Sequence, residues 1–303
     1  MIKGLHIEPT NKCTLKCPRC SRTEFIEQFP NSWTNKELDL EAFKEFFDLD
    51  NIFINICGVY GDPIYYSKLL ELVQFLKSKK CKLQIATNGS YQSEEWWKQL
   101  GQLLDSDDDV VFAIDGLPNN FTEYRINADW DSIKIGIDSL KELPVTLSWQ
   151  YILFKYNEDT VNEAEQLSRE LGFDRFFVIP SARFDNDNDP LIPTLGRDTI
   201  SKSKIQWKQN KDIEIDPKCK QENNYHFISA DGHYTPCCHS YEHRFYFKSE
   251  FWKNKDIYDI TKTTLSKLLN NEKTINFYSN LETTKPEYCK FNCPKGNNET
   301  SSR

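Results

Sequence analysis

The 303-residue sequence has no apolar run that approaches the ~18 residues of a membrane span. Its first residues, MIKGLHIEPTNK, lack the apolar segment of a secretory signal peptide. Positive charge is also scarce, because 38 Lys and Arg stand against 46 Asp and Glu and give a formal net charge of −8. These absences predict a soluble cytoplasmic protein with no membrane contact. The lack of a basic stripe argues against a nucleic-acid substrate or partner.

The sequence does not indicate long disorder either, because it has only 11 Gly and 13 Pro. A hydrophobic fraction of 38%, with 14% aromatic residues, is enough for a core. We find no internal repeat and no low-complexity tract beyond the polar tail KGNNETSSR. The length fits one large domain, or a large domain followed by a small one.

Ten cysteines in a chain without an export signal need an explanation. Disulfides are rare in reducing compartments, where clustered cysteines indicate metal binding or catalysis. Three lie near the N-terminus, Cys57 and Cys81 are isolated, and five follow residue 218. This uneven placement predicts two metal sites, one toward each end of the chain. Free cysteine is commonly buried, so packing is the expected role of Cys57 and Cys81.

Short β-branched runs alternate with amphipathic stretches between residues 4 and 180, which is typical of βα units on a parallel sheet. In such sheets ligands bind beyond the carboxyl ends of the strands. Gly172 is a predicted helix stop. The expected strands are 5–9, 51–57, 82–86, 110–114, 145–154 and 175–180, and the expected helices are 35–49, 67–80, 93–104, 131–143 and 160–172.

The alternation stops after about residue 185. The polar, Pro-containing stretch 183–198 is a predicted linker, and one helix is expected at 263–271. About 100 residues with so little periodicity would form a weak core, which a metal cluster would cross-link. We therefore expect two domains, 1–190 and 191–303.

The stretch CTLKCPRC places Cys13, Cys17 and Cys20 in a loop after the first predicted strand. Three thiolates are one too few for a tetrahedral structural site. The spacing resembles the radical SAM superfamily, whose three cysteines hold a 4Fe–4S cluster with one open iron. The resemblance implies that this iron chelates S-adenosylmethionine, and that a reductant such as flavodoxin or ferredoxin drives its cleavage to a 5′-deoxyadenosyl radical. The alternatives are a zinc site with a distant fourth ligand, or three unrelated buried thiols.

Three further stretches resemble the family's cofactor-binding motifs: GVYGDP, ATNGS and FAIDG followed by an arginine. Each follows a predicted strand, although Gly-Asp-Pro and Asn-Gly alone are also ordinary turn sequences. The family pattern differs at Asp62 (usually Glu), Ala113 (often Ser) and Arg19 (often aromatic). The resemblance implies a partial (β/α)6 TIM-like barrel in an α/β fold. It implies cofactor contacts from Tyr60, Gly61, Asp62, Pro63, Thr87, Asn88, Gly89, Asp115 and Arg125.

The C-terminal cysteines resemble the auxiliary-cluster extensions called SPASM and twitch domains. Five cysteines serve one cluster, so the shorter twitch-type variant is expected, in a small irregular domain. The resemblance implies that Cys219, Cys237, Cys289 and Cys293 close a second 4Fe–4S cluster. Cys238 can exchange roles with Cys237. The alternative is a four-cysteine zinc site, which His239 could join.

An auxiliary cluster with all ligands filled suits electron transfer. The predicted reaction is hydrogen abstraction by the adenosyl radical, followed by one-electron oxidation through this cluster. In relatives this gives dehydrogenation or modification of ribosomal peptides, so the expected substrate is a small molecule or a peptide. Gln150, Tyr151 and Tyr156 are candidate wall residues, and no general base is evident. Modification of RNA or another macromolecule, and a non-catalytic iron–sulfur binding protein, are the alternatives.

Overall fold

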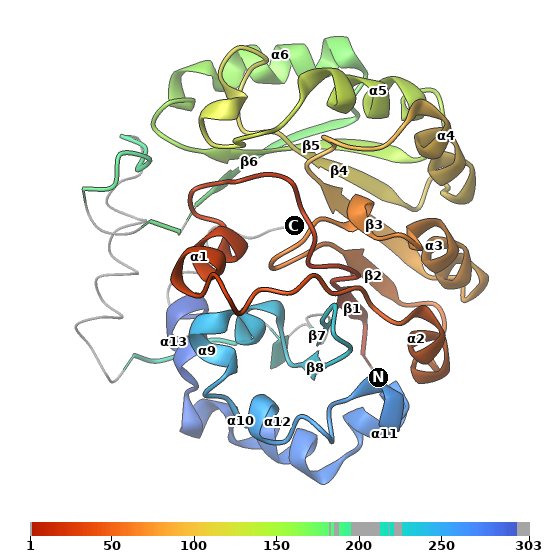
Figure 1. Cartoon of the computed structure of the whole chain (residues 1–303), viewed down its shortest axis with the longest axis vertical. Coiled ribbons are helices and arrows are strands. Elements are labelled where there is room, and N and C mark those ends of the chain that lie inside the picture. The colour runs from red at the N-terminus through yellow and green to blue at the C-terminus, as the bar shows by residue number, and fades with distance from the viewer. Residues whose placement is uncertain are drawn as a thin grey trace.

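The computed structural model describes residues 2–181, 183–184, 188–194, 213–217, 219–220 and 226–295. These residues contain one open eight-stranded sheet in the order β6-β5-β4-β3-β2-β1-β7-β8 (Figure 1). Its first six strands are mutually parallel, as the sequence predicts for a partial barrel. They are β1 (Gly4–Ile7), β2 (Phe53–Ile56), β3 (Lys82–Thr87), β4 (Asp109–Ala113), β5 (Thr146–Leu153) and β6 (Arg175–Pro180).

At least one helix follows each of the first five strands, which gives the expected βα order. Figure 1 shows α3, α4, α5 and α6 along the outside of the sheet. The helices of this part are α1 (Ser21–Gln28), α2 (Leu40–Phe46), α3 (Leu69–Ser78), α4 (Glu94–Leu103), α5 (Trp130–Leu140) and α6 (Val161–Leu171). The short 3-10 helices are η1 (Pro63–Tyr65), η2 (Phe121–Glu123) and η3 (Glu158–Thr160).

Side-chain caps fix where several of these helices begin. The Asp39 carboxylate accepts from the backbone of α2, Ser93 caps α4 and Asp129 caps α5. At the other end of α6, Gly172 adopts a φ of 91°, the left-handed conformation that closes a helix. The predicted stop at Gly172 is confirmed.

The two faces of the sheet differ in polarity because side chains alternate along each strand. Ile54 and Ile85 are fully buried against the helices. Asn55, Gln84 and Gln150 lie on the other face and are only partly buried. The hydrophobic core therefore lies between sheet and helices, and the inner face of the partial barrel presents amide groups.

Two C-terminal strands extend the sheet beyond β1, which sequence periodicity did not indicate. β7 (His226–Ile228) pairs in parallel with β1, and β8 (Tyr234–Thr235) pairs antiparallel with β7. The register places Leu5 opposite His226. The C-terminal region is thus built directly onto the first strand, beside the loop that carries Cys13, Cys17 and Cys20.

Short helices complete the C-terminal region (Figure 1). The predicted helix at 263–271 corresponds to α11. The longer α12 was not predicted, because its sequence EKTINFYSNLETT is rich in weak helix formers. No helix among the described residues is both long and apolar enough to cross a membrane. The elements are η4 (Cys238–Tyr241), α9 (His243–Tyr246), α10 (Glu250–Lys253), η5 (Ile260–Lys262), α11 (Leu265–Leu269), α12 (Glu272–Thr284) and α13 (Glu287–Asn292).

Candidate cofactor and cluster sites

The first cysteine set lies in the loop between β1 and α1, at the carboxyl edge of the sheet. Cys20 occupies the N-cap position of α1, and its N–H donates to the Cys17 carbonyl at 3.1 Å. The loop is held from across the barrel, since the N–H of Lys16 donates to the Ile126 carbonyl at 2.9 Å. The chain therefore places the three cysteines on one loop at the edge where ligands bind in such sheets.

Two thiols of this set, those of Cys13 and Cys17, are poorly solvated. Burial raises the pKa of Cys13 to about 12, and the Asp62 carboxylate adds to the rise. Burial also raises the pKa of Cys17, to about 11, although the nearby Arg125 guanidinium opposes it. Metal ligation requires thiolates, so thiols in this setting need a positively charged partner. Iron ions of a cluster meet that requirement.

The predicted GVYGDP and ATNGS stretches come together through Asp62. Its Oδ1 accepts from Thr87 Oγ1 at 2.7 Å, and its Oδ2 accepts from the Asn88 N–H at 2.6 Å. The Asn88 side-chain nitrogen in turn lies 3.6 Å from Cys13 Sγ. Burial raises the pKa of Asp62, which the hydrogen bonds from Asn88 and Thr87 oppose. Residues from three strand ends thus form one connected group beside the cysteine loop.

Two glycines in these stretches are required by the backbone. A Cβ on Gly61 would lie 1.9 Å from the Thr10 carbonyl oxygen, so only glycine lets this turn approach the cysteine loop. Gly89 has a φ of 70° and lies against the Phe112 ring. Pro63 begins η1 directly after Asp62. Gly61 therefore allows its turn to approach the β1–α1 loop, and Gly89 allows its turn to pack on Phe112.

Asp115 and Arg125 form a buried ion pair beyond β4. Arg125 Nε donates to Asp115 Oδ2 at 2.7 Å, and the Ile152 N–H donates to Asp115 Oδ1 at 2.8 Å. The hydroxyl of Tyr156 donates to the Asp115 carbonyl. Arg125 also lies beside Cys17. The pair therefore holds a guanidinium next to the first cysteine set.

Glu8 is a site residue that motif comparison missed. Its Oε1 accepts from the N–H groups of Tyr60 at 2.6 Å and Gly61 at 3.0 Å, which fixes the GVYGDP turn. The Glu8 side chain is fully buried, and burial raises its pKa to about 7. The Tyr60 ring turns toward the C-terminal region, where its hydroxyl donates to the Tyr241 carbonyl at 3.2 Å. The only sequence indication was an acidic residue inside the apolar run LHIEP.

Arg19, one of the three positions that differ from the family pattern, forms an ion pair with Asp189 in the segment predicted to be a linker. Its Nε donates to Asp189 Oδ2 at 2.8 Å, and the Asp189 side chain is fully buried. Phe184 and Ile192 pack with Leu15 and Cys17 in one apolar cluster. The described part of the segment 183–198 therefore covers the cysteine loop, and the rest of that segment lies outside the described residues.

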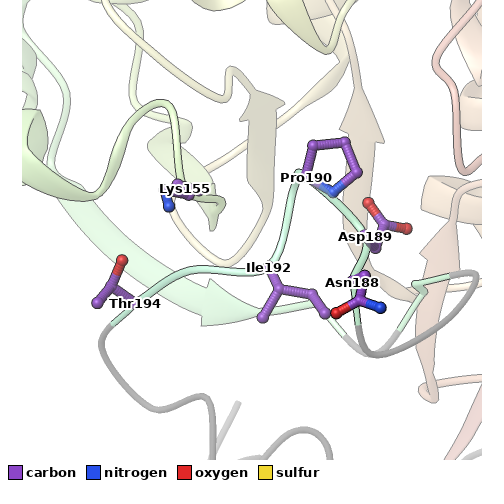
Figure 2. Close-up of a pocket in the computed structure, with 6 residues that line it drawn as sticks. All are labelled: Lys155, Asn188, Asp189, Pro190, Ile192 and Thr194. Carbon is purple, nitrogen blue, oxygen red and sulfur yellow. The ribbon is translucent and has the colours of Figure 1, made fainter.

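A small cavity of about 200 Å³ lies within this covering segment, and Figure 2 shows its lining. Lys155, at the end of β5, lies on one side of it, and its N–H donates to the Leu191 carbonyl at 3.1 Å. The cavity thus marks where the segment rests on the barrel. Its lining residues are Lys155, Asn188, Asp189, Pro190, Ile192 and Thr194.

The second cysteine set assembles in the C-terminal region. Cys219, Cys237 and Cys289 belong to one apolar cluster, and the Cys293 N–H donates to the Cys289 carbonyl at 2.7 Å. Burial raises the pKa of Cys237 to about 12, and the neighbouring Cys293 thiol adds to the rise. Among the described residues, no three His, Cys, Asp or Glu side chains converge closely enough to hold a single metal ion. Four cysteines that lie near one another without converging on one point suit a cluster that distributes its ligands over several irons.

Cys238 diverges from its neighbour Cys237. It packs with Val59 and Phe227 rather than in the apolar cluster of the second cysteine set. The electrostatic neighbours that affect its pKa include Cys57. The Cys237 side chain, and not that of Cys238, therefore lies in the apolar cluster of the second cysteine set. His239 is half-exposed and lies 3.7 Å from Glu242 Oε1.

The isolated cysteines have different environments. Cys81 is buried in the main core, as predicted. Cys57 is only partly buried, and its sulfur lies 2.8 Å from His6 Nε2. Of the candidate wall residues, Gln150 lies on the inner face of the sheet, whereas Tyr151 is buried and donates to the Asn157 carbonyl. Tyr156 packs near the first cysteine loop.

Comparison with known proteins agrees with this geometry. The model described as "Radical SAM superfamily" matches residues 7–168, and the SPASM model, described as "Iron-sulfur cluster-binding domain", matches residues 219–294. A tungsten-containing aldehyde ferredoxin oxidoreductase cofactor-modifying protein of Pyrococcus furiosus is 28% identical over 123 residues, which is 39% of this chain and 32% of that protein. The matched part therefore spans about a third of that relative's length.

Solved structures share the fold at low sequence identity. The anSMEcpe structure with bound AdoMet is 15% identical with a TM-score of 0.61, and the match covers 90% of this chain and 82% of that chain. SuiB of Streptococcus suis bound to its precursor peptide SuiA is 14% identical with a TM-score of 0.62, covering 96% and 71%. The family matches imply a SAM-binding 4Fe–4S cluster, auxiliary iron–sulfur chemistry and S-adenosylmethionine. The chain belongs to the Radical SAM superfamily of enzymes and carries a C-terminal SPASM domain.

Proposed function

We propose that this chain is an oxidoreductase that abstracts a hydrogen atom from its substrate and passes the remaining electron to an auxiliary cluster. When bound, the first cluster and S-adenosylmethionine supply the 5′-deoxyadenosyl radical. The proposal assigns Cys13, Cys17 and Cys20 to the first cluster. It assigns the second cluster to Cys219, Cys237, Cys289 and Cys293. The domain division near residue 190 is part of the same proposal.

The observation that carries this proposal is a chain of ion pairs between the two cysteine regions. Glu24, one turn after Cys20 on α1, lies 4.0 Å from Arg244, which pairs with Glu242 at 2.7 Å. Glu242 also lies 3.7 Å from Arg183, in the segment after β6. Since Glu242 follows Cys237 by five residues, the two cysteine regions are held beside one another. Such an arrangement suits electron transfer between a substrate and the second cluster.

Apolar residues shield one side of the first cysteine set from water. Leu15 and Phe184 pack with Cys17 in the same apolar cluster, and the Arg19–Asp189 pair fastens the covering segment. A dry site protects a reactive radical from side reactions. Asp62, Asn88 and Arg125 lie around the loop as candidate contacts for the amino and carboxylate groups of S-adenosylmethionine.

A peptide is our first candidate for the substrate, and a small molecule the second. The inner face of the sheet carries the amide side chains of Asn55, Gln84 and Gln150, and Gln84 Nε2 donates to Asp109 Oδ2 at 3.2 Å. A polar surface of this kind suits a peptide backbone, which has hydrogen-bonding groups of the same type. SuiB has been solved with a precursor peptide and anSMEcpe with the Cp18Cys peptide, which supports the same choice. The net charge of −8 disfavours RNA. A flavodoxin or ferredoxin is the expected reductant.

Anaerobic reconstitution tests the cluster assignment. Two cubes give about eight iron and eight sulfide per chain. Replacing Cys13, Cys17 and Cys20 with alanine is expected to remove about half of this iron, and Cys81→Ala, in the core, is the matched control. A triple variant that keeps all its iron would overturn the assignment.

Reductive cleavage tests the enzymatic assignment. With dithionite and S-adenosylmethionine, the reconstituted protein is expected to release 5′-deoxyadenosine. The triple cysteine variant is expected to release none, and Cys81→Ala to match the wild type. A fully reconstituted protein that releases no 5′-deoxyadenosine would support a non-catalytic iron–sulfur protein instead.

A further inference from the structure

We propose that the side chains of Tyr278, Tyr234 and His226 form a hydrogen-bonding triad that sets the reduction potential of the auxiliary cluster. The inference rests on the proposed function, because it takes Cys219, Cys237, Cys289 and Cys293 as the ligands of that cluster. It goes further by assigning a role to three residues that no family motif marks. These are positioning residues, since they act through the cluster.

The polar ends of the triad converge on one point. Tyr234 Oη lies 2.7 Å from His226 Nδ1, Tyr278 Oη lies 3.3 Å from the same nitrogen, and the two hydroxyl oxygens are 3.2 Å apart. The His226 and Tyr234 rings are stacked with centroids 5.8 Å apart. Three hydrogen-bonding groups from β7, β8 and α12 therefore lock one another in place.

Two members of the triad are buried and Tyr278 is partly buried, so all three side chains keep their neutral forms. Tyr234 is fully buried, and His226 is only 2% exposed. Burial lowers the pKa of His226 to about 4 and raises the pKa of both tyrosines well above the ordinary value. At neutral pH both phenols therefore retain their protons and act as hydrogen-bond donors.

The triad lies at the wall of the second cysteine set. Tyr278 packs in the same apolar cluster as Cys219, Cys237 and Cys289. The thiols of Cys219 and Cys237 are also electrostatic neighbours of Tyr234. Two tyrosines whose hydroxyls belong to the triad thus lie near the cysteines that would carry the charge of the cluster.

The alternation of side chains along β7 explains this placement. His226 pairs in register with Leu5, whose side chain faces the core, and Phe227 pairs with His6 on the inner face. Phe227 contacts the His6 ring at 4.9 Å and packs with Tyr60. One three-residue strand therefore directs the triad toward the auxiliary site and an aromatic ring toward the first site.

The direction of the expected change in reduction potential follows from the charge that the cluster gains on reduction. Reduction makes a cluster more negative, and polar hydroxyl groups near it stabilise the more highly charged form better than apolar groups would, which raises the potential. A buried site strengthens such dipoles because little water screens them. A raised potential suits a cluster that must accept an electron from a substrate radical. Removing a hydroxyl is then expected to make the cluster harder to reduce.

The test is a potentiometric titration of the anaerobically reconstituted full chain, followed by electron paramagnetic resonance. Tyr278→Phe and Tyr234→Phe each remove one oxygen and keep the ring. Each variant is expected to lower the reduction equilibrium constant of the auxiliary cluster about tenfold, a shift of about 59 mV to more negative potential for one electron. The first cluster is expected to keep its potential. Tyr258→Phe is the matched control, because Tyr258 stacks on Tyr234 but has no cysteine among its electrostatic neighbours.

The outcomes separate the two proposals. Wild-type chains that bind only about four iron would show that the auxiliary ligand set is wrong, which overturns the proposed function and this inference together. Full iron loading with an auxiliary potential unchanged in both tyrosine variants would overturn the inference alone. If one of the two tyrosine variants fails to load iron, the potential of the auxiliary cluster in the other variant tests the inference. Equal shifts in Tyr258→Phe and the triad variants would also overturn it, since packing rather than the hydroxyls would then set the potential.

Discussion

Glu8 shows how one buried carboxyl can order a cofactor-binding turn. Its Oε1 accepts two N–H groups of the GVYGDP turn, while Oε2 has no hydrogen-bond partner among the described residues. Both groups lie more than fifty residues away in the chain. The cysteine spacing was predictable because its members are local in sequence. The role of Glu8 was not, because it depends on which strand lies next to β1.

Glu8 is expected to make stability depend on pH. Burial raises its pKa from the usual 4.5 to about 7, so the folded state binds the proton more tightly. Its contribution is complete below pH 4.5 and is lost as the pH rises through 7, with a span of about 3 kcal/mol. Glu8→Gln keeps an acceptor oxygen without the charge. Urea unfolding at pH 5, 6, 7 and 8 is expected to show a smaller loss of stability for this variant than for the wild type.

Glu45→Gln is the control for that experiment, because Glu45 is exposed on α2. Its unfolding free energy is expected to follow the wild-type pH profile. A Glu8→Gln profile parallel to the wild type would show that the Glu8 carboxyl does not titrate between pH 5 and 8.

At the scale of elements, the alternating strands and helices were predictable from the sequence, whereas β7 and the packing of the segment 183–198 were not. The six parallel strands follow from β-branched runs, and Gly172 ends α6 where expected. β7 has only three residues, too few for any periodicity, and its partner β1 lies more than two hundred residues earlier. The segment 183–198 reads as a linker because it is polar. Its apolar contacts, made by Phe184, Leu191 and Ile192, could be recognised only once the segment was seen packed on the cysteine loop.

The covering segment yields a prediction of its own. Asp189→Asn removes the charge that pairs with Arg19 but keeps the side chain's shape. Because Asp189 is fully buried and Arg19 is 18% exposed, we expect a loss of about 1–3 kcal/mol in unfolding free energy. We also expect faster bleaching of the first cluster's absorbance in air, since the segment shields the cysteine loop.

Lys98→Ala provides the comparison for that variant. Lys98 pairs with Glu94 on the exposed side of α4, and such a surface ion pair contributes little to the unfolding free energy. It is expected to leave both stability and bleaching rate unchanged. Equal bleaching rates in Asp189→Asn and the wild type would show that the segment does not protect the cluster.

For the whole molecule, the junction between the two cysteine regions depends on Glu242. Its side chain is only 4% exposed and lies near three cationic or basic groups, on Arg244, Arg183 and His239. The sequence indicated cysteines at both ends, and the SPASM resemblance implied a cluster there. It did not indicate the junction, because ion pairs between α1, the segment after β6 and α9 depend on how those elements pack.

Glu242→Gln is therefore expected to weaken the molecule at this junction. The variant leaves Arg183 and Arg244 without their shared carboxylate, and because both are partly exposed we expect a loss of about 2–3 kcal/mol in unfolding free energy at pH 7.

The guanidinium and imidazole neighbours lower the pKa of Glu242 despite its burial. Its contribution is thus present above pH 4.5 and is lost as the pH falls further, so the difference from the wild type is expected to narrow in acid. Calorimetry at pH 7 and pH 3.5 measures that difference, with Glu282→Gln, an exposed carboxylate paired with Lys220, as the matched control. A Glu242→Gln protein that unfolds at the wild-type temperature at pH 7 would show that the Glu242 carboxylate does not stabilise the junction.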